Sequence, residues 1–539
     1  MIIKRAFVIV SMCMCMMEIS CVGKWPGGSV TSADRAPVVF PDCAGITIPP
    51  NIAPLNLRIK ETADEFRVAV QGAAGDSLVV YSRNPLITFP EKKWHALLGR
   101  CCGKELRIEV CVRNRGGWTR FAPLVNSVAR ESIDGFLVYR LINPSYYYWG
   151  EMGIYQRDLE TFREKAILTN KTTNDNCINC HSFCRNNPAM MVLHARQNPG
   201  GMLLCRGNTI AKIEASAPGF AGSCAYPSWH PSGRLIAFSV NAIYQVFPSA
   251  RDWYIEVYDS VSHLALYDCD SNTLRRRCAA SVPPEALENM PNWSPDGKYL
   301  YYCSAGPRAT DYRINRGTGT IYCQRDDGSA VRDSADYYMT PKEDRYVESY
   351  RKMRYDLMRV SYDIESRHWG TPEPVLVSSE TGKSISWPRV SPDGRFAMFV
   401  MSSSGYFTIQ HADADLYCMD LSSHRYWRLD SANSSDVESY HTWSSNGRWF
   451  AFSSKRIDGI RARIYICYFD SLGQAHKPFL LPQKDPYFYS TFLKSYNLPE
   501  LVNGMVRFSG RKMSAALLGP AKAVQLSQHP PSPERYGGF

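Results

Sequence analysis

The chain has 539 residues, of which 21% are charged and 45% hydrophobic, and its formal net charge is +11. This length predicts two or three domains, because a single hydrophobic core rarely grows so large. The composition is that of a folded globular protein and excludes a largely disordered chain. The basic residues form no continuous stripe, which excludes the electrostatic footprint of a nucleic-acid-binding protein.

The beginning of the chain has the pattern of an export signal. Lys4 and Arg5 precede an apolar run over residues 6–17, which is too short to span a bilayer as a stable anchor. Cys21 follows a serine, as in a bacterial lipobox, although Glu18 departs from the usual apolar residue. We therefore expect residues 1–21 to be a signal segment and Cys21 to be lipidated. The protein is then exported to the periplasm or outer membrane, with the lipid anchor as its only membrane contact. Cleavage with release to the periplasm is the alternative.

Residues 45–150 are expected to form a β-sandwich-like domain. Short runs in this range alternate apolar and polar residues, as from Leu106 to Arg113, and glycine, proline and asparagine separate them. A period of two indicates half-buried antiparallel strands, and about 100 residues of them suit a small sandwich. The aromatic run at residues 146–149 follows, and a short helix is predicted around residues 156–168.

Residues 151–188 are expected to be a linker that carries a haem. Cys177, Cys180 and His181 form a Cys-x-x-Cys-His motif, which is the attachment motif of c-type haem. In such a motif the two thiols form thioethers with the haem, and the adjacent histidine is the proximal ligand of the iron. Export favours this interpretation, because c-type haem is attached outside the cytoplasm. The sequence therefore predicts one covalent haem c.

Three other interpretations of the motif stay open. Cys177 and Cys180 could form a local disulfide, half of a zinc site or a thioredoxin-like redox pair. However, no second closely spaced pair of Cys or His residues accompanies them, and no βαβ pattern surrounds them.

A motif recurs four times in the second half of the chain. Each copy has a short strand, a tight turn that ends in glycine, and an alternating apolar strand. The copies begin at Tyr226, Met290, Trp387 and Tyr440. This recurrence predicts a β-propeller of six or seven blades over residues 189–485, with a C-terminal extension over residues 486–539. Asp296 and Asp393 are expected to be turn residues, and Trp229, Trp293 and Trp443 are expected to pack between blades.

Several residues downstream of the motif are candidates for the sixth iron ligand. Few helical residues are available to build a separate pocket, so the haem is expected between the two β-regions with a distal ligand from the propeller side. His194 is the first choice, because it follows His181 closely and the intervening loop closes at a low entropic cost. His230 is the second candidate. The remaining candidates are Met190, Met191 and His441.

The repeats resemble the PD40 (WD40-like) repeats of TolB-type β-propellers. The chain as a whole resembles a Bacteroidetes-type group of TolB-like proteins with a cytochrome c motif. The resemblance runs through residues 150–160, 176–183, 229–233 and 439–446. Together with the alternating strands, it predicts an all-β chain, with an N-terminal β-sandwich, a haem segment and a TolB-like propeller in that order. It also implies an envelope location and haem, but no defined substrate.

Three functions are compatible with these features. The first is electron transfer to a redox or envelope protein partner. The second is a propeller-based binding or scaffold lipoprotein in which haem is structural or sensory. The third is a haem enzyme with an open iron site. No acid–base pair, catalytic triad or phosphate-binding loop is visible, so an electron-transfer or binding protein is favoured over an enzyme.

Overall fold

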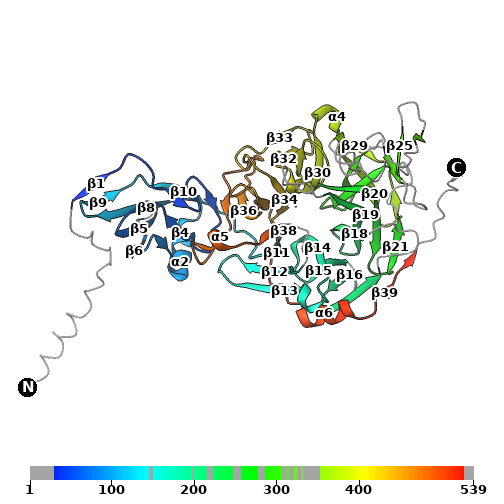
Figure 1. Cartoon of the computed structure of the whole chain (residues 1–539), viewed down its shortest axis with the longest axis horizontal. Coiled ribbons are helices and arrows are strands. Elements are labelled where there is room, and N and C mark those ends of the chain that lie inside the picture. Colours follow the sequence, from blue (N-terminus) through cyan, green and yellow to red (C-terminus); the bar gives the residue numbers. More distant parts are fainter. Residues whose placement is uncertain are drawn as a thin grey trace, which may run out of the picture.

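A computed structural model describes most of the chain (Figure 1). The predicted signal with Cys21, and the aromatic run at residues 146–149, lie outside the described residues. In the part of the chain that is described, no helix is both long and apolar enough to cross a membrane. The described residues are 29–73, 75–144, 150–196, 200–214, 223–246, 256–276, 286–305, 312–314, 321–324, 330–331 and 352–526.

Two sheets and one helix form the N-terminal domain, at the blue end of Figure 1. In the seven-stranded sheet, β8 (Glu105–Asn114) pairs with β5 (Glu65–Gly72) along one edge and with β9 and β10 along the other. The apolar side chains of this sheet and of a three-stranded sheet share one core, as a two-layer β domain requires. The other elements are β1 (Val30–Ser32), β2 (Val39–Phe40), β3 (Thr47–Ile48), β4 (Leu57–Ile59), β6 (Ser77–Ser82), β7 (Leu86–Ile87), α2 (Glu91–Cys101), β9 (Gly117–Arg120) and β10 (Leu124–Val128).

The second part of the chain is a six-bladed β-propeller (Figure 1). Each blade is a sheet whose core of four strands is antiparallel, and the innermost strand of each blade contacts that of the next. The innermost strand of the sixth blade contacts the innermost strand of the first blade, which closes the ring. In order around the ring, the innermost strands are β38 (Ser495–Val502), β14 (Cys177–Phe183), β18 (Ser223–Trp229), β22 (Leu287–Trp293), β30 (Ser384–Val390) and β34 (Glu438–Trp443).

The outer strands follow in chain order within each blade, and blade 1 is the one whose four-stranded core joins two distant segments. Its innermost strand, β38, comes from near the C-terminus and pairs with β11. The outer strands of blade 1 are β11 (Phe136–Ile142), β12 (Gly153–Asp158) and β13 (Glu164–Thr169). Those of blade 2 are β15 (Met190–Arg196), β16 (Gly201–Arg206) and β17 (Thr209–Glu214). Those of blade 3 are β19 (Leu235–Val246), β20 (Glu256–Asp268) and β21 (Thr273–Arg276). Those of blade 4 are β23 (Tyr299–Ala305), β27 (Asp356–Asp363), β28 (His368–Trp369) and β29 (Glu373–Leu376). Those of blade 5 are β31 (Phe396–Ser402), β32 (Asp415–Asp420) and β33 (Tyr426–Arg428). Those of blade 6 are β35 (Trp449–Ser454), β36 (Arg463–Tyr468) and β37 (Phe479–Leu480).

Every innermost strand carries a β-bulge at the same place. In each, the ladder to the second strand shifts register, and one non-glycine residue there has φ between +48° and +53°. Such a backbone is costly for these residues, so its recurrence indicates a structural demand of the ring. Tyr226 of blade 3 and Trp387 of blade 5 make an edge-to-face contact at 5.7 Å although blade 4 lies between them. The bulge residues therefore converge on the axis; they are Cys180, Tyr226, Met290, Trp387, Tyr440 and Leu498.

The four repeated turns lie where the sequence predicts them, between the first and second strands of blades 3 to 6. Asp296 accepts hydrogen bonds from Ser294 Oγ at 2.6 Å and from the backbone of Lys298 at 3.1 Å, so its role as a turn residue is confirmed. The expected packing between blades is also confirmed. Trp443 donates from Nε1 to the carbonyl of Arg389 in the preceding blade, at 3.0 Å.

The observed boundaries differ from those expected. The propeller begins at β11 and ends at β38, so it includes most of the expected linker over 151–188 and part of the expected extension over 486–539. Residues 156–168 lie mainly in β12 and β13 instead of a helix, because their side chains pack in a blade. The C-terminal tail adds α6 (Gly510–Leu518), then β39 (Lys522–Ala523) and β40 (Gln525–Leu526), which pair parallel to the outer edges of blades 2 and 3.

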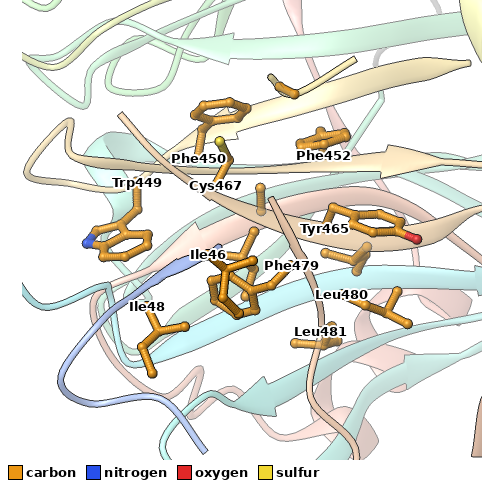
Figure 2. Close-up of a cluster of buried hydrophobic side chains, with 14 of the residues drawn as sticks. Ile46, Ile48, Trp449, Phe450, Phe452, Tyr465, Cys467, Phe479, Leu480 and Leu481 are labelled. Carbon is orange, nitrogen blue, oxygen red and sulfur yellow. The ribbon is translucent and has the colours of Figure 1, made fainter. Parts of the chain in front are cut away.

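The sandwich-like domain is docked on blade 6 through one continuous apolar cluster. Figure 2 shows Ile46 and Ile48 of the N-terminal domain facing Trp449 and Phe479 of the propeller. Trp449 is fully buried and donates from Nε1 to the carbonyl of Glu131 at 3.0 Å. A shared core of this kind fixes the two domains relative to one another.

The rim of this contact is polar. Asp134, which lies between the two domains, accepts a hydrogen bond from the backbone of Ser445 at 2.8 Å, and Lys477 forms an ion pair with Asp42 at 2.7 Å.

Candidate functional site at the propeller axis

The Cys-x-x-Cys-His motif lies in β14, the innermost strand of blade 2. Cys177 is fully buried and packs with Ile142 and Met152, and Cys180 is the bulge residue, with φ of +48°. Burial raises the pKa of the Cys177 thiol to about 11, so this thiol is protonated at neutral pH. The motif is therefore part of the folded interior and not an exposed linker.

His181 occupies a position that recurs in all six innermost strands, directly after the bulge residue. The same position holds His441 in blade 6, and prolines in the others: Pro227, Pro291, Pro388 and Pro499. His441 bonds through Nε2 to the carbonyl of Met398 in the preceding blade, at 3.0 Å. The His181 ring lies at the equivalent carbonyl, that of Val138, although neither ring nitrogen reaches hydrogen-bonding geometry. Burial lowers the pKa of both imidazoles to about 3.

The candidate distal ligands do not converge on His181. His194 pairs with Asn179 in the ladder and points to the opposite face of the blade, where its ring contacts Phe238 at 6.0 Å. His230 lies in the next turn and bonds to Ser232 Oγ at 2.8 Å and to the carbonyl of Gly297 at 3.2 Å.

The remaining candidates also have structural positions. Met191 is fully buried between blades 1 and 2, and Met190 contacts the cluster between blades 2 and 3. His441 lies in blade 6, where it is bonded to blade 5.

These residues do not fit a covalently attached haem in this arrangement. Attachment requires both thiols and the imidazole to meet one porphyrin, whereas the segment from Cys177 to Asn179 is an extended strand hydrogen-bonded to β15. Cys177, Cys180 and His181 are each at most 3% exposed and are covered by protein atoms. His181 also faces blade 1 while His194 faces blade 3, so the two rings lie on opposite sides of a sheet.

A buried polar network lies at the end of the axis where the innermost strands begin. The carboxyl of Asp259, 1% exposed, accepts hydrogen bonds from Asn241 Nδ2 at 2.6 Å, Asn289 Nδ2 at 3.3 Å and the Tyr406 hydroxyl at 2.8 Å. These partners come from blades 3 and 4 and from the loop after β31 of blade 5. Burial raises the pKa of Asp259 to about 6, against the lowering effect of these donors. The network joins three blades around one carboxyl.

Several polar side chains at this end have buried atoms without a hydrogen-bond partner among the described residues. Asn241 and Asn289 each keep an unbonded Oδ1, and Arg140 and Arg196 each keep an unbonded Nε. Both arginines lie close to Cys177. Arg196 pairs with Cys177 in the ladder, and Arg140 is two residues before Ile142, whose side chain packs on Cys177. Unmet buried polar groups are rare and require an explanation, such as an absent ligand, ion or water.

Sequence reasoning did not single out these four residues or Asp259. One signal was available, because residues 179–183 align with residues 439–443 of the last repeat, with histidine at the centre of each segment. That alignment would have placed the Cys-x-x-Cys-His motif within a blade. Nothing local marks Arg140 or Arg196, since their significance depends on the ring that surrounds them.

Comparisons with known proteins show limited similarity. No family model matches the sequence. An uncharacterized protein, Atu1656, from Agrobacterium fabrum is 31% identical over 182 residues, which cover 32% of this chain and 52% of that protein. The chain thus matches about half the length of this curated relative.

Two solved structures are similar at low sequence identity. Prolyl oligopeptidase B from Galerina marginata is 8% identical, with 73% of this chain and 50% of that chain covered and a TM-score of 0.31. A DUF4784 family protein from Bacteroides caccae is 10% identical, with 72% and 94% covered and a TM-score of 0.24. Because both TM-scores are low, the propeller assignment here rests on strand order and ring closure in this chain.

Proposed function

We propose that the chain is an exported, propeller-based binding protein whose ligand site is the end of the axis around Asp259. The observation that carries this proposal is the group of buried, unbonded polar atoms on Arg140, Arg196, Asn241 and Asn289. Burying such groups without partners is unfavourable, and a ligand that completed their hydrogen bonds would recover that free energy. Export and lipidation at Cys21 remain part of this proposal and rest on the sequence alone.

Electron transfer through a c-type haem is the competing function. It requires Cys177, Cys180 and His181 to leave their interior strand and meet one porphyrin, with loss of the packing on Ile142 and Met152. The resemblance to TolB-like proteins with a cytochrome c motif supports that alternative, whereas the burial of the motif supports a binding protein. One experiment separates the two functions.

The full-length protein should be produced with the haem maturation machinery and purified from an envelope fraction. We expect no covalent haem on a denaturing gel stained for haem, and no pyridine haemochrome spectrum. A stained band at the mature mass, lost in Cys177→Ser with Cys180→Ser, would refute the proposal in favour of a cytochrome.

Ligand binding is then measured by thermal shift against small molecules grouped as sugars, amino acids, carboxylates and phosphates. We expect at least one group to raise Tm, because a ligand that binds only the folded state stabilises it. Asn289→Ala should remove that shift, whereas Asn114→Ala, in an exposed hairpin of the N-terminal domain, should preserve it. No shift with any group would contradict the axial binding function.

A further inference from the structure

Two arginines lie beside the start of β14 without a carboxylate partner. Arg140 belongs to β11 of blade 1 and is 5% exposed. Arg196 is the last residue of β15 in blade 2 and stands opposite Cys177 in the antiparallel ladder. Among the described residues neither guanidinium forms an ion pair, and the Nε of each is buried without a hydrogen bond.

The groups around these arginines do not neutralise them. The Cys177 thiol lies near both guanidiniums, but burial raises its pKa to about 11, so it carries no charge at neutral pH. Asp259 is directed to Asn241, Asn289 and Tyr406 instead of to an arginine. The side chains that interact electrostatically with Arg196 are those of Cys177, Cys180, Tyr226 and Tyr406, none of which is a carboxylate.

Arg140 is buried and Arg196 is partly buried. Two such positive charges without anionic partners are energetically unfavourable, because little water is available to solvate them. Elsewhere among the described residues, buried arginines have partners for the guanidinium group. Arg67 forms an ion pair with Glu109 at 2.8 Å, and Arg157 and Arg463 donate to the carbonyl oxygens of Pro482 and Lys494 at 2.9 and 2.7 Å. Arg140 and Arg196 differ from these residues, because neither guanidinium forms an ion pair or a side-chain hydrogen bond with the described residues.

We propose that Arg140 and Arg196 bind the carboxylate or phosphate group of a small anionic ligand at the axial end of the propeller. The guanidinium group is planar, stays charged and presents donors that match two oxygens of either anion. The unbonded Oδ1 atoms of Asn241 and Asn289 would accept hydrogen bonds from hydroxyl or amino groups elsewhere on the ligand. This inference rests on the proposed binding function and names the chemical class of its ligand.

The test uses the full-length protein, with inorganic phosphate, succinate and uncharged succinamide as probes in isothermal titration calorimetry at pH 7.5. We expect phosphate or succinate to bind at least tenfold more tightly than succinamide, and the two anions to show which acidic group is preferred. Raising the ionic strength should weaken anion binding, because salt screens charge attraction.

Matched variants locate the site. Arg196→Met and Arg140→Met should each weaken anion binding tenfold or more, whereas Arg425→Met, which changes an exposed arginine of blade 5, should leave it unchanged. Arg196→Lys keeps the charge but loses the paired donors, so we expect an intermediate affinity. If the methionine variants do not fold, the comparison of anions with succinamide on the unaltered protein still decides the charge of the ligand.

Different outcomes separate the two proposals. Equal binding of succinamide and succinate, or anion binding that Arg425→Met weakens as much as Arg196→Met, would overturn the anion assignment. Binding of an uncharged sugar that Asn289→Ala abolishes, without any binding of anions, would overturn the assignment and leave the binding function standing. If no ligand group raises Tm in the thermal-shift series, both proposals are overturned.

Discussion

Position 181 shows how one residue type can suggest a chemistry that its neighbours do not support. Its histidine follows a bulge residue in the left-handed region, and four of the five equivalent positions hold proline after a bulge residue of the same conformation. The site therefore tolerates a residue without a backbone N–H donor. At His441 the ring contributes a hydrogen bond between blades, which is a structural role.

This equivalence predicts that His181→Pro folds. We expect the variant to be soluble and folded, with a loss of about 1–2 kcal/mol from the missing imidazole packing. Cys180→Pro is the matched control, because proline cannot adopt the φ of +48° found there and should cost about 3 kcal/mol or more. Urea unfolding followed by circular dichroism measures both. Failure of His181→Pro to fold, with losses as large as those of Cys180→Pro, would contradict the equivalence of the six positions.

The buried histidines also predict acid sensitivity. His181, His194 and His441 have pKa values lowered to about 3, so the unfolded chain takes up their protons below about pH 6.5 while the native state does not. Asp259, whose pKa is raised to about 6, acts in the opposite direction. Between roughly pH 4 and 6 these four groups together make the unfolded state bind about two more protons, which lowers stability by roughly 3 kcal/mol per pH unit as the pH falls. Asp134, Glu438 and Glu500, whose pKa values burial raises, reduce this slope.

Urea titrations at pH 6, 5.5 and 5 measure this slope. His194→Leu should reduce it by about one proton, or roughly 1.4 kcal/mol per pH unit, because one depressed pKa is removed. An equal slope in His194→Leu and in the unaltered protein would contradict the burial of a neutral imidazole at position 194.

At the scale of the element, each of the four repeats consists of a strand, a turn and a second strand, and the turn is stabilised mainly by adjacent residues. The turns in blades 4 and 5 use an aspartate that bonds to the backbone two residues later and a glycine with φ near +75°. Contacts with the neighbouring blade then make equivalent turns differ in how well they tolerate a side chain at the glycine. Gly297 faces His230 of blade 3, whereas Gly394 has more open surroundings.

This difference predicts unequal effects of the same substitution. Gly394→Ala should cost about 1–2 kcal/mol, the usual price of a side chain in left-handed backbone. Gly297→Ala should cost more, because its Cβ would lie 2.3 Å from His230 Nε2. Adding His230→Ala to Gly297→Ala should remove part of the additional loss. Equal unfolding free energies for the two glycine variants, measured in urea, would contradict this packing.

At the scale of the whole molecule, stability depends on joining segments that are distant in sequence. Blade 1 needs β38 from the C-terminal region as its innermost strand, so the ring is closed by strand pairing between the two ends of the propeller. The tail beyond α6 only adds short, exposed strands at the outer edges of blades 2 and 3.

Truncations test this arrangement. Deletion of residues 520–539 should leave a soluble, folded protein, because β39 and β40 are exposed and short. Deletion from residue 495 onward removes β38 and should prevent formation of a stable propeller, since blade 1 loses its innermost strand. A folded, monomeric product of the longer deletion, judged by size-exclusion chromatography and circular dichroism, would contradict closure by β38.

The docking of the N-terminal domain gives a second prediction at this scale. Trp449→Ala should cost about 3–5 kcal/mol, because it empties a fully buried site shared by the two domains and removes a hydrogen bond to Glu131. Calorimetry should then show separate unfolding of the two domains where the unaltered protein shows one transition. A single unshifted transition in the variant would contradict the shared core in Figure 2.

By itself the sequence determined the features that depend on local chemistry. Alternation of apolar residues indicated the strands of both β-regions, and the turns around Asp296 and Asp393 predicted the propeller, because such turns form from adjacent residues.

Only the tertiary structure decided where the Cys-x-x-Cys-His motif lies. The short span from Cys177 to His181 is compatible with a haem segment, a redox pair or a strand, and its pairing with β15 and packing against β11 and β38 select the strand. The unpaired charges of Arg140 and Arg196 likewise become visible only when the ring brings blades 1 and 2 together, because charge compensation depends on spatial neighbours and not on adjacent residues.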